Sequence, residues 1–217
     1  MNDNKPDAIF FDWDGTLVDT LPGLLLAHNH VRAHFDFPLW TRDQFHKEMK
    51  YSSRELYPKI YGDRTEEAIN ILREFMDKEI LKYVTPLKNS EVLLRRIHKM
   101  GIPIGIVSNK RHEFLLREVA HLGWGKYIAV QAGSGYADQD KPSGAPIRKA
   151  LGEVGINPED SLVWFVGDTE TDLLAAQDSA CLSVLILHGT QHPELIEKHS
   201  PAYVFNDCQD LLSSLEV

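Results

Sequence analysis

The stretch Ala8–Asp14 constrains the fold of this chain more than any other part of its sequence. Four apolar residues run directly into the acidic residue Asp12, and Asp14 and Gly15 follow at once. Such a run predicts a short, fully buried strand that ends at a polar turn. In a parallel sheet covered on both faces, ligands bind at the carboxyl ends of the strands. Two neighbouring carboxylates at such an end are typical either of a hard-cation site or simply of an Asp-rich turn.

Two further apolar runs end at polar residues in the same way. Residues 102–107 lead into Ser108 and Asn109, and residues 162–166 lead into Gly167 and Asp168. Because the carboxyl ends of parallel strands meet at one edge of a sheet, we expect these polar side chains to lie close to those of the first run. Because polar residues end three apolar runs, a ligand site is a better interpretation than an Asp-rich turn without a function.

Strand and helix patterns alternate over most of the chain. Pro103 and Gly105 make residues 102–107 unfavourable as a central strand, because Pro cannot donate to a β ladder. Further strands are predicted at residues 127–130, 183–187 and 203–205, and helices at residues 90–100, 111–122, 146–154 and just after Asp172. The alternation predicts an α/β fold with a doubly wound parallel sheet, that is, a Rossmann-like core.

A helical stretch interrupts this pattern after the first strand. Apolar residues recur at helical spacing over residues 21–35 and 65–83. Capping-box patterns that begin at Thr41 and Ser52 predict two more helix starts between them. The predicted domains are therefore an α/β core, residues 1–19 and 85–217, and an inserted all-helical cap, residues 20–84.

Composition narrows the range of partners. The 217 residues carry a formal net charge of −9, which argues against nucleic acid or an anionic membrane as a partner. The two cysteines are too few for a disulfide framework. The sequence has no apolar signal core at its start and no run of membrane-spanning length, so we expect a cytoplasmic protein, either a monomer or a homodimer.

The polar groups at the strand ends suit phosphoryl transfer. Asp12 and Asp168 can hold Mg²⁺, and Lys141, in the loop after the strand at 127–130, can offset charge on phosphate oxygens. Ser108 supplies a hydroxyl group at the same edge. Asp172 lies one helical turn beyond Asp168 and is suited to orient a ligand or a metal-bound water.

Four ordered motifs carry a family resemblance. The chain resembles the haloacid-dehalogenase-like hydrolases, and its helical insert resembles the cap of their phosphoglycolate-phosphatase-like branch. The matching motifs are Asp12-Trp13-Asp14-Gly15-Thr16, Ser108-Asn109-Lys110, Lys141-Pro142 and Gly167-Asp168-Thr169 with Asp172. Together they cover nearly the whole chain.

The resemblance implies a mechanism. Asp12 would be the nucleophile that forms an aspartyl-phosphate, and Asp14 would be the general acid and then the general base. Mg²⁺ would be the cofactor, bound by Asp12, the backbone carbonyl of Asp14 and Asp168, and we include Asp172 in this metal group. The substrate would be a small phosphorylated metabolite, and the enzyme a phosphatase that acts on a phosphomonoester.

Further residues are expected to contact the substrate. By the same resemblance, Ser108, Asn109 and Lys141 would hold the transferring phosphoryl group. Thr16 is a further candidate for phosphate contact. From the residues of the insert, Arg54 is a candidate to reach the leaving group. Lys110, in contrast, is interpreted as a solvated cation, because strand-to-helix junctions often carry such residues.

Other activities on the same core stay open. Dehalogenases of the family lack an acid at the position of Asp14, so phosphate chemistry is the better interpretation. A phosphonate hydrolase would need a cap lysine that forms an imine, for which Lys47, Lys50 and Lys59 are available. A sugar-phosphate mutase is a second alternative, and a non-enzymatic interaction protein is disfavoured because both acids and Lys141 are present.

Overall fold

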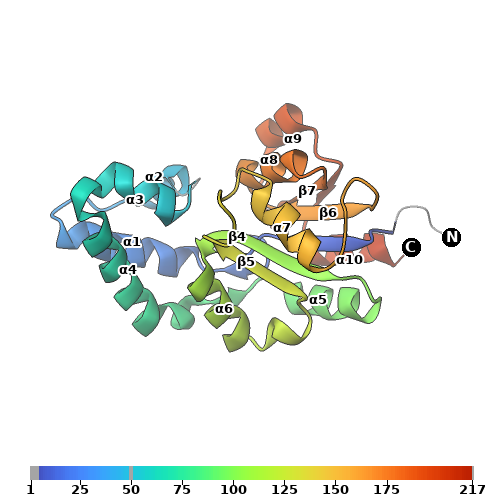
Figure 1. The fold of residues 1–217 in the computed structure, drawn as a ribbon, viewed down its shortest axis with the longest axis horizontal. Helices are drawn as coiled ribbons and strands as arrows, with labels where there is room; N and C mark the ends of the chain where they lie inside the picture. The colour runs from blue at the N-terminus through green and yellow to red at the C-terminus, as the bar shows by residue number, and fades with distance from the viewer. Residues whose placement is uncertain (1–4, 49–50, 217) are drawn as a thin grey trace.

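A six-stranded parallel sheet forms the centre of the computed structural model, which describes residues 5–48 and 51–216. The strand order is β5-β4-β1-β6-β7-β8 (Figure 1). The strands are β1 (Ala8–Phe11), β4 (Ile104–Arg111), β5 (Val130–Ser134), β6 (Val163–Gly167), β7 (Leu182–Ile186) and β8 (Tyr203–Phe205). The sheet grows outward from β1 first on one side and then, from β6 onward, on the other. The predicted doubly wound α/β fold is therefore confirmed, with its switch point between β1 and β6.

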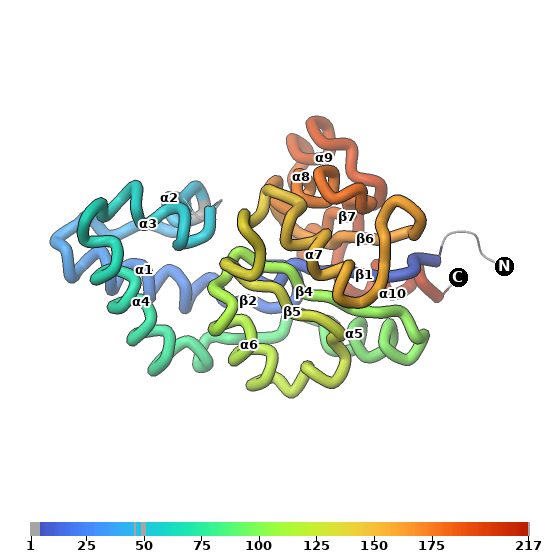
Figure 2. Tube along the Cα trace, viewed as in Figure 1, coloured from blue at the N-terminus to red at the C-terminus, as the bar shows by residue number. Residues whose placement is uncertain are grey.

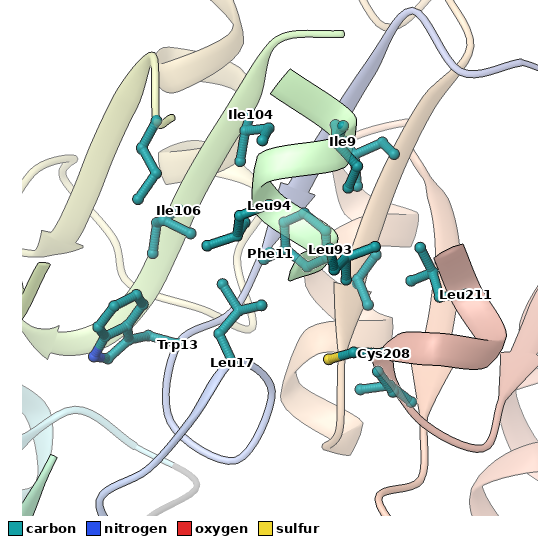
Figure 3. Close-up of a cluster of buried hydrophobic side chains, with 14 of the residues drawn as sticks. Ile9, Phe11, Trp13, Leu17, Leu93, Leu94, Ile104, Ile106, Cys208 and Leu211 are labelled. Atoms are coloured by element: carbon teal, nitrogen blue, oxygen red, sulfur yellow. The ribbon is translucent and has the colours of Figure 1, made fainter. Parts of the chain in front are cut away.

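The first strand shows why the sheet is covered on both faces. Ile9 and Phe11 pack into one apolar cluster, whereas Ala8 and Phe10 pack into another on the opposite face. Successive side chains of a strand point to opposite faces, so a continuous apolar run requires a layer on each side. Figure 3 shows the first cluster, where Ile9 and Phe11 lie beside Leu93.

Helices supply both layers. On one face lie α5 (Ser90–Lys99), α6 (His112–His121) and α10 (Cys208–Leu215); on the other lie α7 (Ala145–Glu153) and α8 (Glu170–Asp178). The remaining elements after β4 are the 3₁₀ turn η3 (Trp124–Lys126) and α9 (Pro193–His199). No helix in the described part of the chain has both the length and the apolar character that a membrane span needs.

Two strand predictions need correction. Residues 104–111 form a central strand between β1 and β5, because Pro103 precedes the ladder and Gly105 fits against a ring. A Cβ on Gly105 would lie 2.6 Å from ring carbons of Phe10, so this position needs glycine. The strand predicted at 127–130 begins only at Val130, because the buried Trp124 anchors the turn η3 before it.

The helical insert is confirmed as a run of helices. It contains α1 (Leu21–His34), α2 (Arg42–Glu48), α3 (Ser53–Tyr61), η1 (Gly62–Arg64), α4 (Thr65–Glu79) and η2 (Ile80–Tyr83). These helices pack around their own apolar cluster and lie beyond one end of the sheet, as Figure 2 shows. We call them the helical segment. Its status as a separate domain over residues 20–84 stays a prediction.

A two-residue ribbon joins the helical segment to the sheet. The strand β2 (Val18–Asp19) pairs in antiparallel fashion with β3 (Thr85–Pro86), so the chain enters and leaves the segment side by side. The ribbon was not predicted, because a pair of two-residue strands has no periodicity that a sequence pattern can show.

The two predicted capping boxes have different outcomes. The side chains of Thr41 and Gln44 exchange hydrogen bonds with each other's backbone N–H groups at 2.9 and 3.3 Å, as predicted. The capping box at Ser52 is wrong, although α3 does begin at Ser53. The Ser52 hydroxyl instead donates to the buried carboxylate of Asp140, at 2.6 Å. A hydrogen bond to a charged acceptor is strong, so this contact holds the Ser52 side chain toward the neighbouring loop.

Candidate active site

The predicted site residues gather at the carboxyl edge of the sheet. Asp12 follows β1, Ser108 and Asn109 lie on β4, Lys141 lies in the loop after β5, and Asp168 follows β6. All of them line a cavity of about 950 Å³ between this edge and the helical segment. Sequence positions up to 156 residues apart are therefore brought together by strand order alone.

Lys141 lies between two carboxylates. Its Nζ donates to Asp12 Oδ1 at 2.7 Å and to Asp172 Oδ1 at 2.6 Å, and all of these groups are buried. The second oxygen of Asp172 accepts hydrogen bonds from the backbone and the hydroxyl of Thr169, which caps α8. Asp172 is thus held by the helix start on one side and by Lys141 on the other.

Three carboxylates form a group that can hold a cation. Asp12, Asp168 and Asp172 each offer one oxygen, and these atoms lie within 4.8 Å of one another. Gly15 allows this approach, because a Cβ at this residue would lie 2.5 Å from Asp168 Oδ2. The Thr16 hydroxyl donates to Asp168 Oδ1 at 2.9 Å, so the structure places Thr16 on this carboxylate.

The electrostatics of the group favour an added positive charge. Burial raises the pKa of Asp12 to about 7; the Lys141 ammonium opposes this shift, and the Asp172 and Asp14 carboxylates add to it. Burial, followed by the Asp172 and Asp12 carboxylates, also raises the pKa of Asp168 well above its usual range. One lysine does not compensate three closely spaced carboxylates, so a hard cation with oxygen ligands fits this donor set.

Asp14 lies beside this group and faces other partners. Its Oδ1 accepts hydrogen bonds from Thr20 Oγ1 and, at 2.6 Å, from Lys110 Nζ. The interpretation of Lys110 as a solvated cation is wrong, because its side chain is only 2% exposed and also contacts Glu118. No pattern in the sequence indicates this arrangement, since Glu118 lies on a helix among apolar residues.

The polar residues on β4 have different tasks. Asn109 exchanges two hydrogen bonds with the backbone of Lys141, at 2.8 and 2.9 Å, so its amide fixes the loop that carries this lysine. Ser108 is buried and its Oγ accepts from the backbone N–H of Lys110 at 3.1 Å. Both side chains also line the cavity. Their contact with phosphate stays a prediction.

Arg54 is placed away from the cavity lining. Its guanidinium donates to the backbone carbonyls of Ala137 and Asp138, both at 3.4 Å, and lies 3.9 Å from Asp140. Among the described residues of the helical segment, the cation that lines the cavity is Arg42. A role of Arg54 toward the leaving group stays a prediction.

The chain is similar to a known family of hydrolases. A family model described as "Haloacid dehalogenase-like hydrolase" matches residues 9–186. The chain is 27% identical to a phosphoglycolate phosphatase from Photorhabdus laumondii over 96% of this chain and 92% of that protein. It is 28% identical to a phosphoglycolate phosphatase from Escherichia coli K12, with the same coverage.

A solved structure agrees on the fold. A haloacid dehalogenase-like family hydrolase from Streptococcus pneumoniae superimposes with a TM-score of 0.82 over 97% of this chain and 98% of that one. The two sequences are 21% identical, so this likeness concerns the fold alone.

Proposed function

The chain belongs to the haloacid dehalogenase-like hydrolases, and on this premise we propose that it is a Mg²⁺-dependent phosphatase that hydrolyses a small phosphomonoester through an aspartyl-phosphate on Asp12. The observation that supports the proposal best is the position of Lys141 between Asp12 and Asp172, beside Asp168. A carboxylate nucleophile, an acidic group for a hard cation and a buried ammonium together meet the needs of phosphoryl transfer.

In the first half of the reaction, Asp12 attacks phosphorus. Lys141 donates to Oδ1 of this carboxylate and favours its ionised form, while the opposite oxygen, Oδ2, accepts no hydrogen bond from the described residues. The bond between phosphorus and the leaving oxygen breaks as the bond to Asp12 forms. Asp14, in its protonated form, donates a proton to the leaving oxygen, which therefore departs as a neutral hydroxyl group of the product.

In the second half, water replaces Asp12 on phosphorus. Asp14, now ionised, accepts a proton from the attacking water, and the bond between Asp12 and phosphorus breaks. Mg²⁺ would be held by Asp12, the Asp14 carbonyl, Asp168 and Asp172. When bound, the ion offsets negative charge on the phosphate oxygens and on the nucleophile.

The helical segment is proposed to act as a cap over this site. Described residues of α1, α2, α3 and α4 line the same cavity as the sheet edge, so a bound leaving group would lie between the two. The two relatives named above, each aligned over 96% of this chain, are phosphoglycolate phosphatases. Phosphoglycolate is therefore the first substrate to test.

The phosphonate-hydrolase alternative has less support. Lys47 and Lys59 are exposed and do not line the cavity, and Lys50 lies outside the described residues. No described lysine of the helical segment is therefore in a position to form an imine with a substrate in this cavity.

Phosphate release tests the proposal. The purified protein should release phosphate from members of a phosphomonoester panel that includes phosphoglycolate and nitrophenyl phosphate. EDTA should abolish this activity and Mg²⁺ should restore it. Mass spectrometry after a rapid acid quench should find the added phosphate on the peptide that contains Asp12. Full activity in chelated protein, or a label on another aspartate, would contradict the mechanism.

A further inference from the structure

Two buried charged residues, Lys110 and Glu118, lie next to the acidic group, and the reaction described above uses neither of them. Lys110 Nζ donates at 2.6 Å to both Asp14 Oδ1 and Glu118 Oε2. Trp13 Nε1 donates to the same Glu118 oxygen at 2.7 Å. The side chains of Lys110 and Glu118 are 2% and 0% exposed.

Glu118 occupies a place that packing alone would give to an apolar residue. It lies on α6 between Leu115 and Val119, which pack into the apolar cluster over the sheet. Burial raises its pKa, and its Oε1 accepts no hydrogen bond from the described residues. Buried ion pairs are often no more stabilising than well-packed apolar side chains. Packing therefore does not require a carboxylate at this position. We look for its role in the residues that Glu118 contacts.

The contacts of Asp14 show what is held. Lys110 and Thr20 both contact Oδ1, and among the described residues no donor contacts Oδ2. With Oδ1 occupied by two donors, Oδ2 is the oxygen of Asp14 that is left to exchange a proton with a ligand. The side chain of Asp14 is 17% exposed and lines the cavity, so this second oxygen is the one available to a leaving group.

We propose that Lys110, held in place by Glu118, is a positioning residue that fixes Oδ1 of Asp14 and so presents Oδ2 to the leaving oxygen and then to water. This inference rests on the proposed phosphatase function and assigns two residues to its acid–base step. Lys110 would act through Asp14 and not by contact with phosphate. Loss of Lys110 leaves Asp14 with Thr20 as its described partner and free to turn about its side-chain bonds.

Leaving-group dependence tests this role. A nitrophenolate departs without a proton, whereas an alkoxide needs one, so a misplaced acid slows alkyl phosphates selectively. We expect Lys110→Met to lower kcat/KM, which reports the transfer of the phosphoryl group to Asp12, by on the order of 10–100-fold for an alkyl phosphate and much less for nitrophenyl phosphate. Glu118→Leu should show the same selectivity with a smaller loss. Asp14→Asn gives the limiting ratio between the two substrates.

A double variant separates positioning from folding. Lys110→Met/Glu118→Gln removes the buried ammonium together with the Glu118 carboxylate and keeps an acceptor for Trp13, so its thermal unfolding midpoint should lie closer to the wild type than that of Lys110→Met. It should still show the selective loss on the alkyl phosphate. Glu91→Gln, at an exposed position on α5, is the matched control and should leave both rates unchanged.

Each other outcome overturns the inference. Equal losses of kcat/KM on both substrates would indicate a structural role, and a raised KM on both would indicate that Lys110 binds phosphate directly. An unchanged ratio in the folded double variant would also refute it. If the wild type releases no phosphate from any substrate, the proposed function itself has failed, which is a distinct result.

Discussion

The helical segment and the sheet edge bury polar side chains in opposite ways. In the helical segment, His28 is buried among aromatic rings, and its Nδ1 lies 3.1 Å from the Tyr57 hydroxyl. Burial, together with Arg32, lowers the pKa of His28 to about 4, so this group stays neutral. At the sheet edge, Asp12 and Lys141 are buried as a charged pair next to further carboxylates.

The difference separates stability from function. A neutral, hydrogen-bonded group in an apolar cluster adds to the stability of the fold. Like charges that are buried together oppose folding, and such arrangements persist where a ligand or a reaction uses them. We therefore expect substitutions in the apolar cluster of the helical segment that do not line the cavity to change mainly the free energy of unfolding, and substitutions at the sheet edge to change mainly catalysis.

The largest expected effect is at the nucleophile. Asp12→Asn should lower turnover by on the order of 10⁴-fold or more, because no oxygen remains to attack phosphorus. In Mg²⁺-free buffer the same variant should unfold at a higher temperature than the wild type, because one of three neighbouring carboxylates has lost its charge. Phosphate release and calorimetry measure the two effects, and Asp138→Asn, an exposed position, serves as the control. A less stable Asp12→Asn protein would break the comparison.

The reverse behaviour is expected for Leu56, which is 4% exposed in the cluster of the helical segment and does not line the cavity. Leu56→Ala should lower the free energy of unfolding by about 2–5 kcal/mol, through lost transfer energy and a new void. The folded variant should hydrolyse nitrophenyl phosphate at nearly the wild-type rate. Denaturant titration measures the first quantity, and Leu26→Ala, at a position 46% exposed, is the control. A large loss of turnover on this small substrate would contradict the separation.

The free energy of unfolding should depend on the protonation of His28. The pKa of His28 falls from 6.5 to about 4 on folding, so protonation below pH 6.5 favours the unfolded chain. This contribution, about 3 kcal/mol, is fully present above pH 6.5 and is lost as the pH falls to about 4. His28→Gln keeps an acceptor for Tyr57 but does not titrate, so its unfolding free energy should fall less over this range. Parallel pH curves for the two proteins would count against a neutral His28.

The smallest effects are expected where the two regions touch. Ser52 and Arg54 of the helical segment both contact Asp140, but Ser52 is buried and the Arg54 side chain is 48% exposed. Ser52→Ala should lower the free energy of unfolding by about 1.5–3 kcal/mol, because a charged acceptor loses one of its two buried hydroxyl donors. Arg54→Ala should lower it by at most about 1 kcal/mol, because water screens an exposed pair. Equal effects of the two changes would show that burial does not decide the strength of this contact.

Local patterns predicted the parts of the site that follow directly from strand ends. Asp12 and Asp168 each come at the end of an apolar run, so their position at the sheet edge required only the parallel topology. The positions of Lys141 and Asn109 at the same edge were predicted as well, but the hydrogen bonds between the Asn109 amide and the Lys141 backbone were not. The amide of Asn109 serves the backbone of Lys141, 32 positions away, and no spacing rule connects such a pair.

The same reason explains why Lys110 was misinterpreted. A strand-to-helix junction is usually exposed, and only the packing of α6 across β4 places Glu118 over this lysine. The contact of Lys110 with Asp14 spans 96 positions and depends on two neighbouring strands of the sheet. Sequence patterns record which residues are buried on an element, whereas the pairing of buried charges is a property of the assembled layers.

The ribbon of β2 and β3 bears on how such a chain can diversify. Because Val18 pairs with Pro86 and Asp19 with Thr85, the chain departs from the sheet and returns to it at one point. With respect to the six-stranded sheet, the residues between those pairs form a loop, and the paired residues hold the two ends of this loop together. The entropy of closing a loop grows only slowly with its length. Helices can therefore be lengthened, exchanged or added at this junction without a change in strand order. Asp12 and Asp168 lie outside the stretch between the paired residues, so such a change would leave them in place at the ends of β1 and β6.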